Sequence, residues 1–436
     1  MSNKQKYGEV ITPFHFVETI LDLLPNEIFK KPHLKWLDPC AGSGNFANIL
    51  YKRLFNGLSA EIKEPKKRHR HIIENMIYMV ELNESHIDGL FELFGDNANI
   101  AHMDYLQLKK QGFDIIIGNP PFNVNGSIKV PTNKTHSKTN DGKAVWMDFV
   151  KNSVSNLNAG GYLAMITPSI WMKRDHPLFL KMSEWGEIGK LHTLTNTETN
   201  TIFLKQAQVA TCYFVLHKNG KFGIRTYDIG KREYLLSGIN LSIPLKYPSI
   251  ISKISKFVSK VGCIPVIKTS MRPGYKGLSV SNVYNDTHSF PNISTCLLNK
   301  LQPELSINYS NKPCHYNGIE KLVLAHKMYG FPYYDKDGKY GISNRDNYII
   351  VNYNCNEFYR LKTFLSTKFA LLVFESTRYR MKFLERYAFE YLPDITKLHD
   401  FPEDITDESI SDYFNFNKME RKEIADITKR DYLTIN

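Results

Sequence analysis

The sequence predicts an α/β fold, in which a mostly parallel sheet carries helices on both faces, followed by a second domain of α+β type. Three observations support this prediction. Short apolar runs alternate with longer amphipathic stretches in the first half, turns rich in Gly and Pro follow several of these runs, and the composition changes near residue 219. Alternating strand-length and helix-length segments are typical of βαβ units, whose strands pair in parallel.

The expected elements follow one another along residues 1–218. Strands are predicted at 34–38, 77–81, 114–117 and 162–166, helices at 46–55 and 146–157, and a closing hairpin at 188–194 and 209–217. Ligands of such sheets bind outside the carboxyl ends of the strands, near the point where the strand order reverses. Two polar segments, 61–71 and 123–143, are expected to be mobile.

Charge divides the 436-residue chain into unequal parts. Residues 1–218 carry a net charge of +4, residues 219–399 carry +13, and residues 400–436 carry −5. A basic part after a near-neutral one indicates either a surface that holds a polyanion or a solubilising surface, and charge alone favours neither. On the first interpretation, residues 1–218 form a catalytic domain and residues 219–436 a recognition domain. The acidic tail from about 400 is expected to be a solvated helix or a frayed end.

Several classes of protein are not expected from the composition. The six cysteines form no CxxC pair, and no His pair has zinc-ligand spacing, which argues against a disulfide scaffold and a structural zinc site. The polar start MSNKQKYGEV does not resemble a signal peptide, and no apolar run reaches the ~20 residues of a membrane helix. We expect a soluble intracellular (cytoplasmic) protein with reduced thiols.

A glycine-containing turn follows the first predicted strand. In the run Asp38-Pro39-Cys40-Ala41-Gly42-Ser43-Gly44, two glycines would let the backbone approach a ligand closely at the start of a helix. The run lacks the GKS/T ending of a phosphate loop and the GxGxxG pattern of a dinucleotide site. By itself it is equally compatible with a plain βα turn.

Two acidic residues follow later strands. Glu81 ends the second strand, where a carboxylate can accept hydrogen bonds from both hydroxyls of a ribose. Asp104 lies in the segment His102-Met103-Asp104-Tyr105-Leu106 and could accept a bond from an adenine amine. Taken alone, a solvated strand end and a turn-capping Asp would explain these two residues.

The strongest signal is Asn119-Pro120-Pro121-Phe122, directly after the strand Asp114–Ile117. The two prolines stiffen the chain and remove two N–H donors, so the side-chain oxygen of Asn119 and the carbonyl of Pro120 remain as acceptors. Such a pair suits a substrate NH2 group. Accepting both hydrogens of a nucleobase amine would aim its lone pair at an electrophile, while Phe122 offers a flat face for the base.

Together these motifs resemble the gamma class of DNA amino-methyltransferases, the TaqI-like group, over residues 8 to about 217. The resemblance implies a Rossmann-like class I methyltransferase sheet, S-adenosylmethionine as methyl donor, S-adenosylhomocysteine as product and no metal. It also implies that the Thr12-Pro13 turn touches the methionine end of the donor and that Leu82 packs on its adenine. The implied donor-binding residues are Thr12, Pro13, Asp38, Pro39, Ala41, Gly42, Gly44, Glu81, Leu82, Asp104, Tyr105 and Asn119, and the catalytic ones are Asn119, Pro120, Pro121 and Phe122.

The same resemblance implies a flipped-out target base between two aromatic rings, Phe122 and Phe203. Phe203 could instead be an ordinary core residue. In the basic half, the densest cluster is Arg378-Tyr379-Arg380-Met381-Lys382 with Arg386-Tyr387, so Arg378 and Arg380 are candidate phosphate contacts, although a solvated face explains any single Arg equally well.

The sequence therefore predicts methyl transfer to N6 of adenine in double-stranded DNA. Cytosine N4, RNA and a protein glutamine amide remain alternative acceptors, and a DNA-binding module without catalysis is a further alternative. We expect a monomer without membrane contact and no fused nuclease, and a separate restriction endonuclease is a candidate partner.

Overall fold

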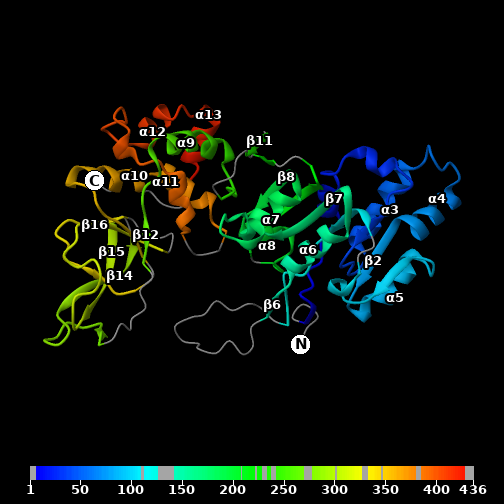
Figure 1. Ribbon diagram of the computed structural model, residues 1–436, viewed down its shortest axis with the longest axis horizontal. Coiled ribbons are helices and arrows are strands. Elements are labelled where there is room, and N and C mark those ends of the chain that lie inside the picture. Colours follow the sequence, from blue (N-terminus) through cyan, green and yellow to red (C-terminus); the bar gives the residue numbers. More distant parts are fainter. Residues whose placement is uncertain are drawn as a thin grey trace. The chain divides into compact units, whose positions relative to one another are not determined.

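The computed structural model describes most of the chain and divides it into two compact units, residues 1–239 and 240–436 (Figure 1). Each unit has its own sheet and core. The described residues are 6–109, 112–125, 142–207, 209–220, 223–227, 233–236, 242–269, 277–299, 302–326, 332–344, 347–379 and 384–427.

A nine-stranded sheet forms the centre of the first unit, in the order β11-β10-β8-β9-β7-β4-β1-β2-β3. The strands from β3 to β7 pair in parallel, whereas β9 is antiparallel to both β7 and β8. This is the predicted Rossmann-like sheet with its closing hairpin. The bounds are β1 Trp36–Asp38, β2 Ile77–Glu81, β3 Asn99–His102, β4 Phe113–Gly118, β7 Leu157–Pro168, β8 Gly186–Leu194, β9 Thr211–Lys218, β10 Ile224–Tyr227 and β11 Glu233–Leu236.

The strand order reverses at β1, because the chain runs from β1 to β2 and β3 and then returns to β4 on the other side of β1. The carboxyl ends of β1, β2 and β4 therefore lie at one edge of the sheet, where a ligand site is expected. The sheet also continues past residue 218 through β10 and β11, so the division between the units falls about twenty residues after the boundary expected from composition.

Helices cover both faces of this sheet, as the sequence predicts. Trp36, Ile115 and Ile117 share one core with residues of α2 (Phe14–Leu21), α3 (Asn45–Gly57) and α5 (Glu84–Phe94). The alternate strand positions Leu37 and Ile116 are equally buried and face the other way. The elements α6 (Trp146–Asn156) and α7 (Pro177–Trp185) pack against β7 and β8, and the remaining short elements are η1 Asn26–Lys30, η3 Tyr105–Gln107, η4 Ser169–Met172 and α8 Asn196–Ile202.

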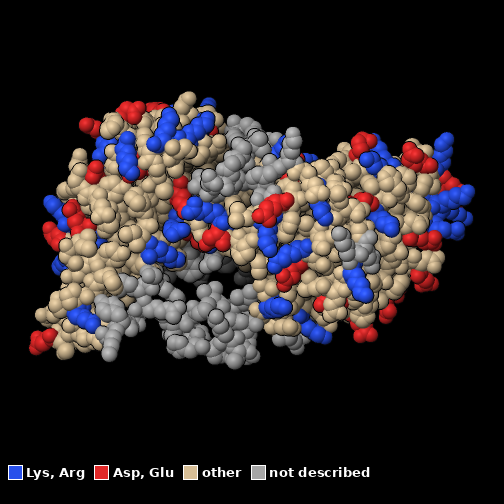
Figure 2. Space-filling view, viewed as in Figure 1, with Lys and Arg blue, Asp and Glu red and all other residues tan. Residues whose placement is uncertain are grey.

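The basic segment 61–71, expected to be mobile, is instead anchored to α3. It forms α4 (Pro65–His71), which leads into a π-helical turn, η2 (Ile72–Met76). The guanidinium of Arg68 lies 4.1 Å from the ring centroid of Phe55 and donates to the carbonyl of Ile62 (3.1 Å), and His69 bonds the hydroxyl of Tyr51 (2.8 Å). Figure 2 shows Lys and Arg side chains gathered on the end of this unit where α4 lies.

The second polar segment, 123–143, is described only at its two ends. There β5 (Asn123–Val124) pairs with β6 (Lys143–Ala144) in antiparallel fashion. Residues 126–141 lie outside the described part of the chain.

The second unit is of α+β type. One four-stranded sheet, β12-β19-β16-β17, packs against a group of helices through Leu322, Leu324 and Ile350, and its other face packs against a second four-stranded sheet, β13-β15-β14-β18. The bounds are α9 Pro248–Val261, β12 Ile267–Lys268, β13 Val280–Ser281, β14 Phe290–Asn299, β15 Gln302–Ser310, β16 Lys321–Ala325, β17 Tyr333–Asp335, β18 Gly341–Ile342, β19 Asn347–Ile350, α10 Cys355–Leu365, α11 Lys368–Ser376, η5 Arg386–Tyr391, η6 Ile395–Lys397, α12 Asp407–Tyr413 and α13 Lys418–Ala425.

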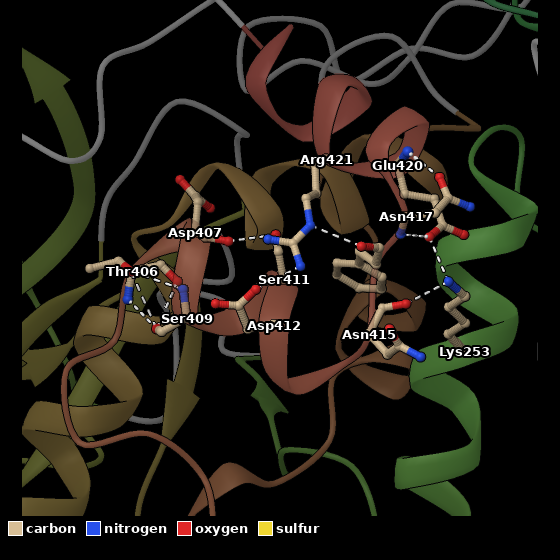
Figure 3. A network of polar contacts seen from close by, with 11 residues as sticks. Lys253, Thr406, Asp407, Ser409, Ser411, Asp412, Asn415, Asn417, Glu420 and Arg421 are labelled. Carbon is tan, nitrogen blue, oxygen red and sulfur yellow. Dashed lines mark hydrogen bonds and ion pairs between the residues drawn. The ribbon is translucent and has the colours of Figure 1, made fainter.

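The prediction of a solvated or frayed acidic tail is wrong for residues 400–427. Phe401, Phe414 and Phe416 are buried in the helical core of the second unit. Figure 3 shows how polar contacts fix α12 and α13: Lys253 of α9 pairs with the buried Glu420 (2.6 Å), and Arg421 pairs with Asp412 (2.7 Å). Apart from the buried Glu423, the acidic residues of this stretch face outward or cap helices, while aromatic side chains between them supply the burial.

This packing predicts that the tail contributes to stability. Phe414 lies between the rings of Phe257 (4.9 Å) and Phe369 (5.7 Å), so Phe414→Ala should destabilise the second unit by about 3–5 kcal/mol. The measurement is native-state hydrogen exchange of the α11 amides in the full chain. The exposed Met419→Ala is the control and should cost less than about 0.5 kcal/mol, and unchanged exchange in Phe414→Ala would contradict the packing.

Candidate functional site

A cavity of about 360 Å³ lies at the carboxyl edge of the first unit's sheet. Its wall combines the turns after β1, β2, β3 and β4 with the N-terminal segment 6–12. The lining residues are Lys6, Tyr7, Gly8, Glu9, Val10, Ile11, Thr12, Pro39, Cys40, Ala41, Gly42, Ser43, Asn45, Phe46, Glu81, Leu82, Asn83, Met103, Asp104, Tyr105, Leu106, Asn119, Pro121, Val124, Asn125, Val145 and Phe149.

The glycine turn has the backbone geometry that its sequence suggests. Gly42 and Gly44 have φ of +53° and +82°, which favour glycine, and Gly44 forms the N-cap of α3. A Cβ on Gly44 would approach Leu90 Cδ2 to 3.0 Å, whereas one on Gly42 would meet no atom within 4 Å. The need for glycine at 42 is therefore conformational, and its open surface belongs to the cavity wall.

Two carboxylates stand behind this turn. Glu81 accepts from the backbone N–H groups of Gly42 and Asn83, each at 2.7 Å, so it joins the turns after β1 and β2. Asp38 Oδ1 accepts from the N–H of Cys40 (3.2 Å), while Oδ2 is buried without a partner in the described chain. Burial, with a smaller contribution from the charge of Glu81, raises the pKa of Asp38 to about 7.

The residues after β2 and β3 form the next part of the wall. Leu82 is 48% exposed and lines the cavity, so its side chain is available to an apolar ligand group. Asp104 lines the cavity as well, and its Oδ1 caps η3 by accepting from the N–H of Leu106 (2.9 Å). Tyr105 is buried: its hydroxyl bonds Ser153 (3.0 Å), and burial raises the pKa of this phenol.

Asn119 lines the cavity directly after β4 and is held there by its amide nitrogen. Its Nδ2 donates to Thr12 Oγ1 (3.1 Å) and to the carbonyl of Val10 (3.5 Å). Its Oδ1 is buried and has no hydrogen-bond partner among the described residues. Pro120 is buried and Pro121 lines the cavity. The turn Asn119-Pro120-Pro121, which we call the proline corner, therefore lies at the same cavity as the glycine turn.

Not every candidate residue reaches this cavity. Phe203 is 2% exposed and packs edge-on against Phe16 (5.7 Å, 89°), so it occupies the core and is not among the described lining residues. Phe122 is half-buried against the same core, and Pro13 starts α2, where its carbonyl accepts from the N–H groups of Phe16 and Val17.

The candidate phosphate contacts in the second unit are only partly described. Arg378 donates to both carboxylate oxygens of Glu375 (3.2 Å each), so its charge is partly compensated. The neighbouring Tyr379 is buried and donates to the carbonyl of Ile243. Arg380 lies outside the described residues.

Sequence reasoning missed three residues at the cavity. Glu9 pairs with His86 of α5 (2.6 Å), which ties the N-terminal segment to the wall. Asn83 caps α5 by accepting from the N–H of Ser85 (3.3 Å), while its Nδ2 is buried with no acceptor in the described chain. Asn45 donates to the carbonyl of Thr12 (2.7 Å). Only the capping position of Asn83 has a sequence signal, since Asn precedes a helical stretch.

Within the described ranges, no group of three or more His, Cys, Asp or Glu side chains is placed to hold a metal ion. In that part of the chain, no helix has the length and apolar character that a bilayer crossing requires. All six cysteines are free thiols.

Comparison with known proteins gives a family match over the region that builds this cavity. A family model described as Eco57I restriction-modification methylase matches residues 40–203. A protein of Mycoplasma pneumoniae described as an uncharacterized adenine-specific methylase is 24% identical over 327 residues, covering 53% of this chain and 75% of the relative. The type II methyltransferase M.PaeR7I of Pseudomonas aeruginosa is 27% identical over 188 residues, covering 38% of this chain and 32% of the relative.

Solved structures with a similar arrangement include two restriction-modification proteins. The M protein of the type I enzyme EcoKI matches with a TM-score of 0.37 and 18% identity, over 50% of this chain and 48% of that one. The type IIL enzyme MmeI, solved in complex with DNA, matches with a TM-score of 0.46 and 12% identity, over 89% of this chain and 68% of that one. The chain thus spans about half the length of the EcoKI protein and a third of M.PaeR7I.

The raised pKa of Asp38 predicts a pH-dependent cost in the ligand-free protein. The pKa of this carboxyl is about 7 in the folded protein and 3.8 in the unfolded chain. Its contribution to the free energy of unfolding is therefore fully present below pH 3.8 and is lost as the pH rises to about 7. Asp38→Asn should therefore gain stability relative to wild type by about 1.4 kcal/mol per pH unit in that window and level off above it. The measurement is the unfolding free energy at pH 5, 6, 7 and 8. Asp148→Asn, at an exposed ion pair, is the control, and a pH-independent difference for Asp38→Asn would contradict the assignment.

Proposed function

We propose that this chain transfers a methyl group from S-adenosylmethionine to N6 of adenine in DNA. The observation that carries the proposal is Asn119, an unpaired buried acceptor in a cavity shared with the glycine turn. The family match at residues 40–203 spans both features, and the M. pneumoniae relative is described as adenine-specific. This assignment agrees with the function that the sequence predicts.

The residues of the cavity fit the methyl donor. Asn83 and Asn119, which line the cavity, and Asp38, behind the glycine turn, each bring a buried polar atom that no described residue satisfies, and a bound donor would offer these atoms partners. We infer that the glycine turn and Glu81 hold the ribose and methionine parts, and that Leu82 and Asp104 hold the adenine. When bound, the donor supplies an electrophilic methyl group.

The corner at Asn119 acts on the acceptor amine. A nucleobase NH2 is a weak nucleophile because its lone pair is delocalised into the ring. In our proposal the side-chain oxygen of Asn119 and the carbonyl of Pro120 accept its two hydrogens, which frees the lone pair for attack. The prolines keep these acceptors in place, since they fix φ and leave no N–H nearby to compete for them.

The target base must leave the duplex to reach this corner, at a cost of a few kcal/mol. Phe122, beside the corner, is the ring we assign to stacking on the base. A stacking role for Phe203 requires this side chain to leave its core position against Phe16, so in the described conformation we assign it to packing.

The finer assignment is to the gamma class, the TaqI-like group. It rests on the order of the motifs, with Thr12-Pro13 before the glycine turn and the NPPF run after it. On this assignment, residues 219–436 recognise duplex DNA, and Arg378 and Arg380 remain candidate phosphate contacts. We further propose an intracellular enzyme that works as a monomer, with any restriction endonuclease as a separate protein.

The test of this function compares labelled methyl transfer to duplex DNA, RNA and protein. Single-molecule sequencing of DNA from cells that express the chain then reads the base and the site together. Methyl groups on cytosine N4, on RNA or on a glutamine amide would replace the proposed acceptor, and donor binding without transfer would favour a binding module.

Removal of the Asn119 side chain should abolish transfer and spare donor binding. Asn119→Ala is expected to lower methylation by about a hundredfold or more, because the amine loses its acceptor. S-adenosylhomocysteine binding, measured by calorimetry, should remain. The exposed Asn97→Ala is the matched control, and full activity in Asn119→Ala would refute the mechanism.

Asn83 should contribute a hydrogen bond to the donor. Asn83→Asp keeps an oxygen that caps α5 but replaces the unpaired Nδ2 donor with an acceptor, so S-adenosylhomocysteine should bind about tenfold more weakly at unchanged thermal stability. Asn97→Asp controls for the added charge. Equal affinity in wild type and Asn83→Asp would assign Asn83 to capping alone.

A further inference from the structure

The N-terminal segment 6–12 contacts several of the loops that form the cavity. Gly8 (φ +70°) packs so closely that a Cβ there would lie 2.0 Å from the carbonyl oxygen of Asn123, and the carbonyl of Lys6 accepts from the N–H of Asn125 (3.2 Å). Glu9 pairs with His86 (2.6 Å). The segment is therefore a fixed part of the wall.

The end of this segment determines which way the Asn119 amide points. An amide group is nearly symmetric in shape, so packing alone does not distinguish its oxygen from its nitrogen. Here the two hydrogens of Nδ2 face Thr12 Oγ1 (3.1 Å) and the carbonyl of Val10 (3.5 Å). A flipped amide would place Oδ1 against the Val10 carbonyl, which has no hydrogen to donate.

We propose that Thr12 is a positioning residue: its hydroxyl accepts from Nδ2 and, together with the Val10 carbonyl, holds the Asn119 amide with Oδ1 toward the acceptor amine. This inference rests on the proposed function and differs from the role that the resemblance implies for Thr12, which is contact with the methionine end of the donor. Thr12 is 5% exposed, and its carbonyl is already bonded by Asn45 (2.7 Å), so the hydroxyl is held in place from the backbone side.

The test compares Thr12→Val, which keeps the shape and removes the hydroxyl, with Thr12→Ser, which keeps the hydroxyl. At saturating donor and DNA, kcat of Thr12→Val should fall about tenfold, the equivalent of one hydrogen bond, while the Kd for S-adenosylhomocysteine stays within about twofold. Thr12→Ser should retain kcat. A raised Kd with unchanged kcat in Thr12→Val would overturn the proposal in favour of donor contact, and equal loss in both variants would indicate packing.

A second measurement does not depend on catalysis. In the full chain labelled with ¹⁵N-asparagine, the side-chain NH2 of Asn119 is assigned by its loss in Asn119→Ala. Its protons should exchange with solvent more slowly in wild type and Thr12→Ser than in Thr12→Val. Equal exchange rates in wild type and Thr12→Val would overturn the positioning role, even if the wild type methylates DNA. If exchange is slower in wild type but the wild type methylates no DNA, the positioning role stands and the proposed function is refuted.

Discussion

The cavity depends on polar groups that the folded chain buries and does not satisfy. Asp38, Asn83 and Asn119 each present such an atom, and a buried unpaired group costs about 1–3 kcal/mol. Asn83 and Asn119 line one cavity at the carboxyl edge of the sheet and Asp38 lies behind its glycine turn, so a ligand in this cavity can offset part of the cost. The unpaired atoms of the cavity wall are an acceptor, Asn119 Oδ1, and a donor, Asn83 Nδ2, which on the proposed function serve the acceptor amine and the methyl donor.

The sheet makes this arrangement possible. Neighbouring parallel strands β1, β2 and β4 end at the same edge, so residues 38, 81 and 119 meet although about 40 residues separate each from the next. Glu81 then links the first two turns through the N–H groups of Gly42 and Asn83. The N-terminal segment closes the wall from outside the sheet, and its part without regular structure, residues 8–12, carries the two groups that bond Asn119.

The features predicted well from sequence are those that local pattern determines. The strand-length apolar runs and the two glycines with positive φ carry their structure within a few residues. The errors come from contacts between distant residues. Segment 61–71 is anchored by the contact of Arg68 with Phe55 and contains the helix α4, and the acidic tail is folded because Phe401 and Phe414 join a core built with α9 and α11. The roles of Phe203 and Arg378 depend on partners, Phe16 and Glu375, that composition does not indicate.

The charge of the cavity wall bears on the direction of the proposed reaction. Among the described lining residues, Glu9, Glu81 and Asp104 stand against one lysine, Lys6, and Glu9 already has His86 as its partner. The remaining carboxylates, with Asp38 behind them, favour a ligand that carries positive charge. On the proposed function the donor is a sulfonium ion and the product a neutral thioether, so methyl transfer removes a positive charge from this wall. The same carboxylates that favour the donor therefore hold the product less tightly, which assists its release.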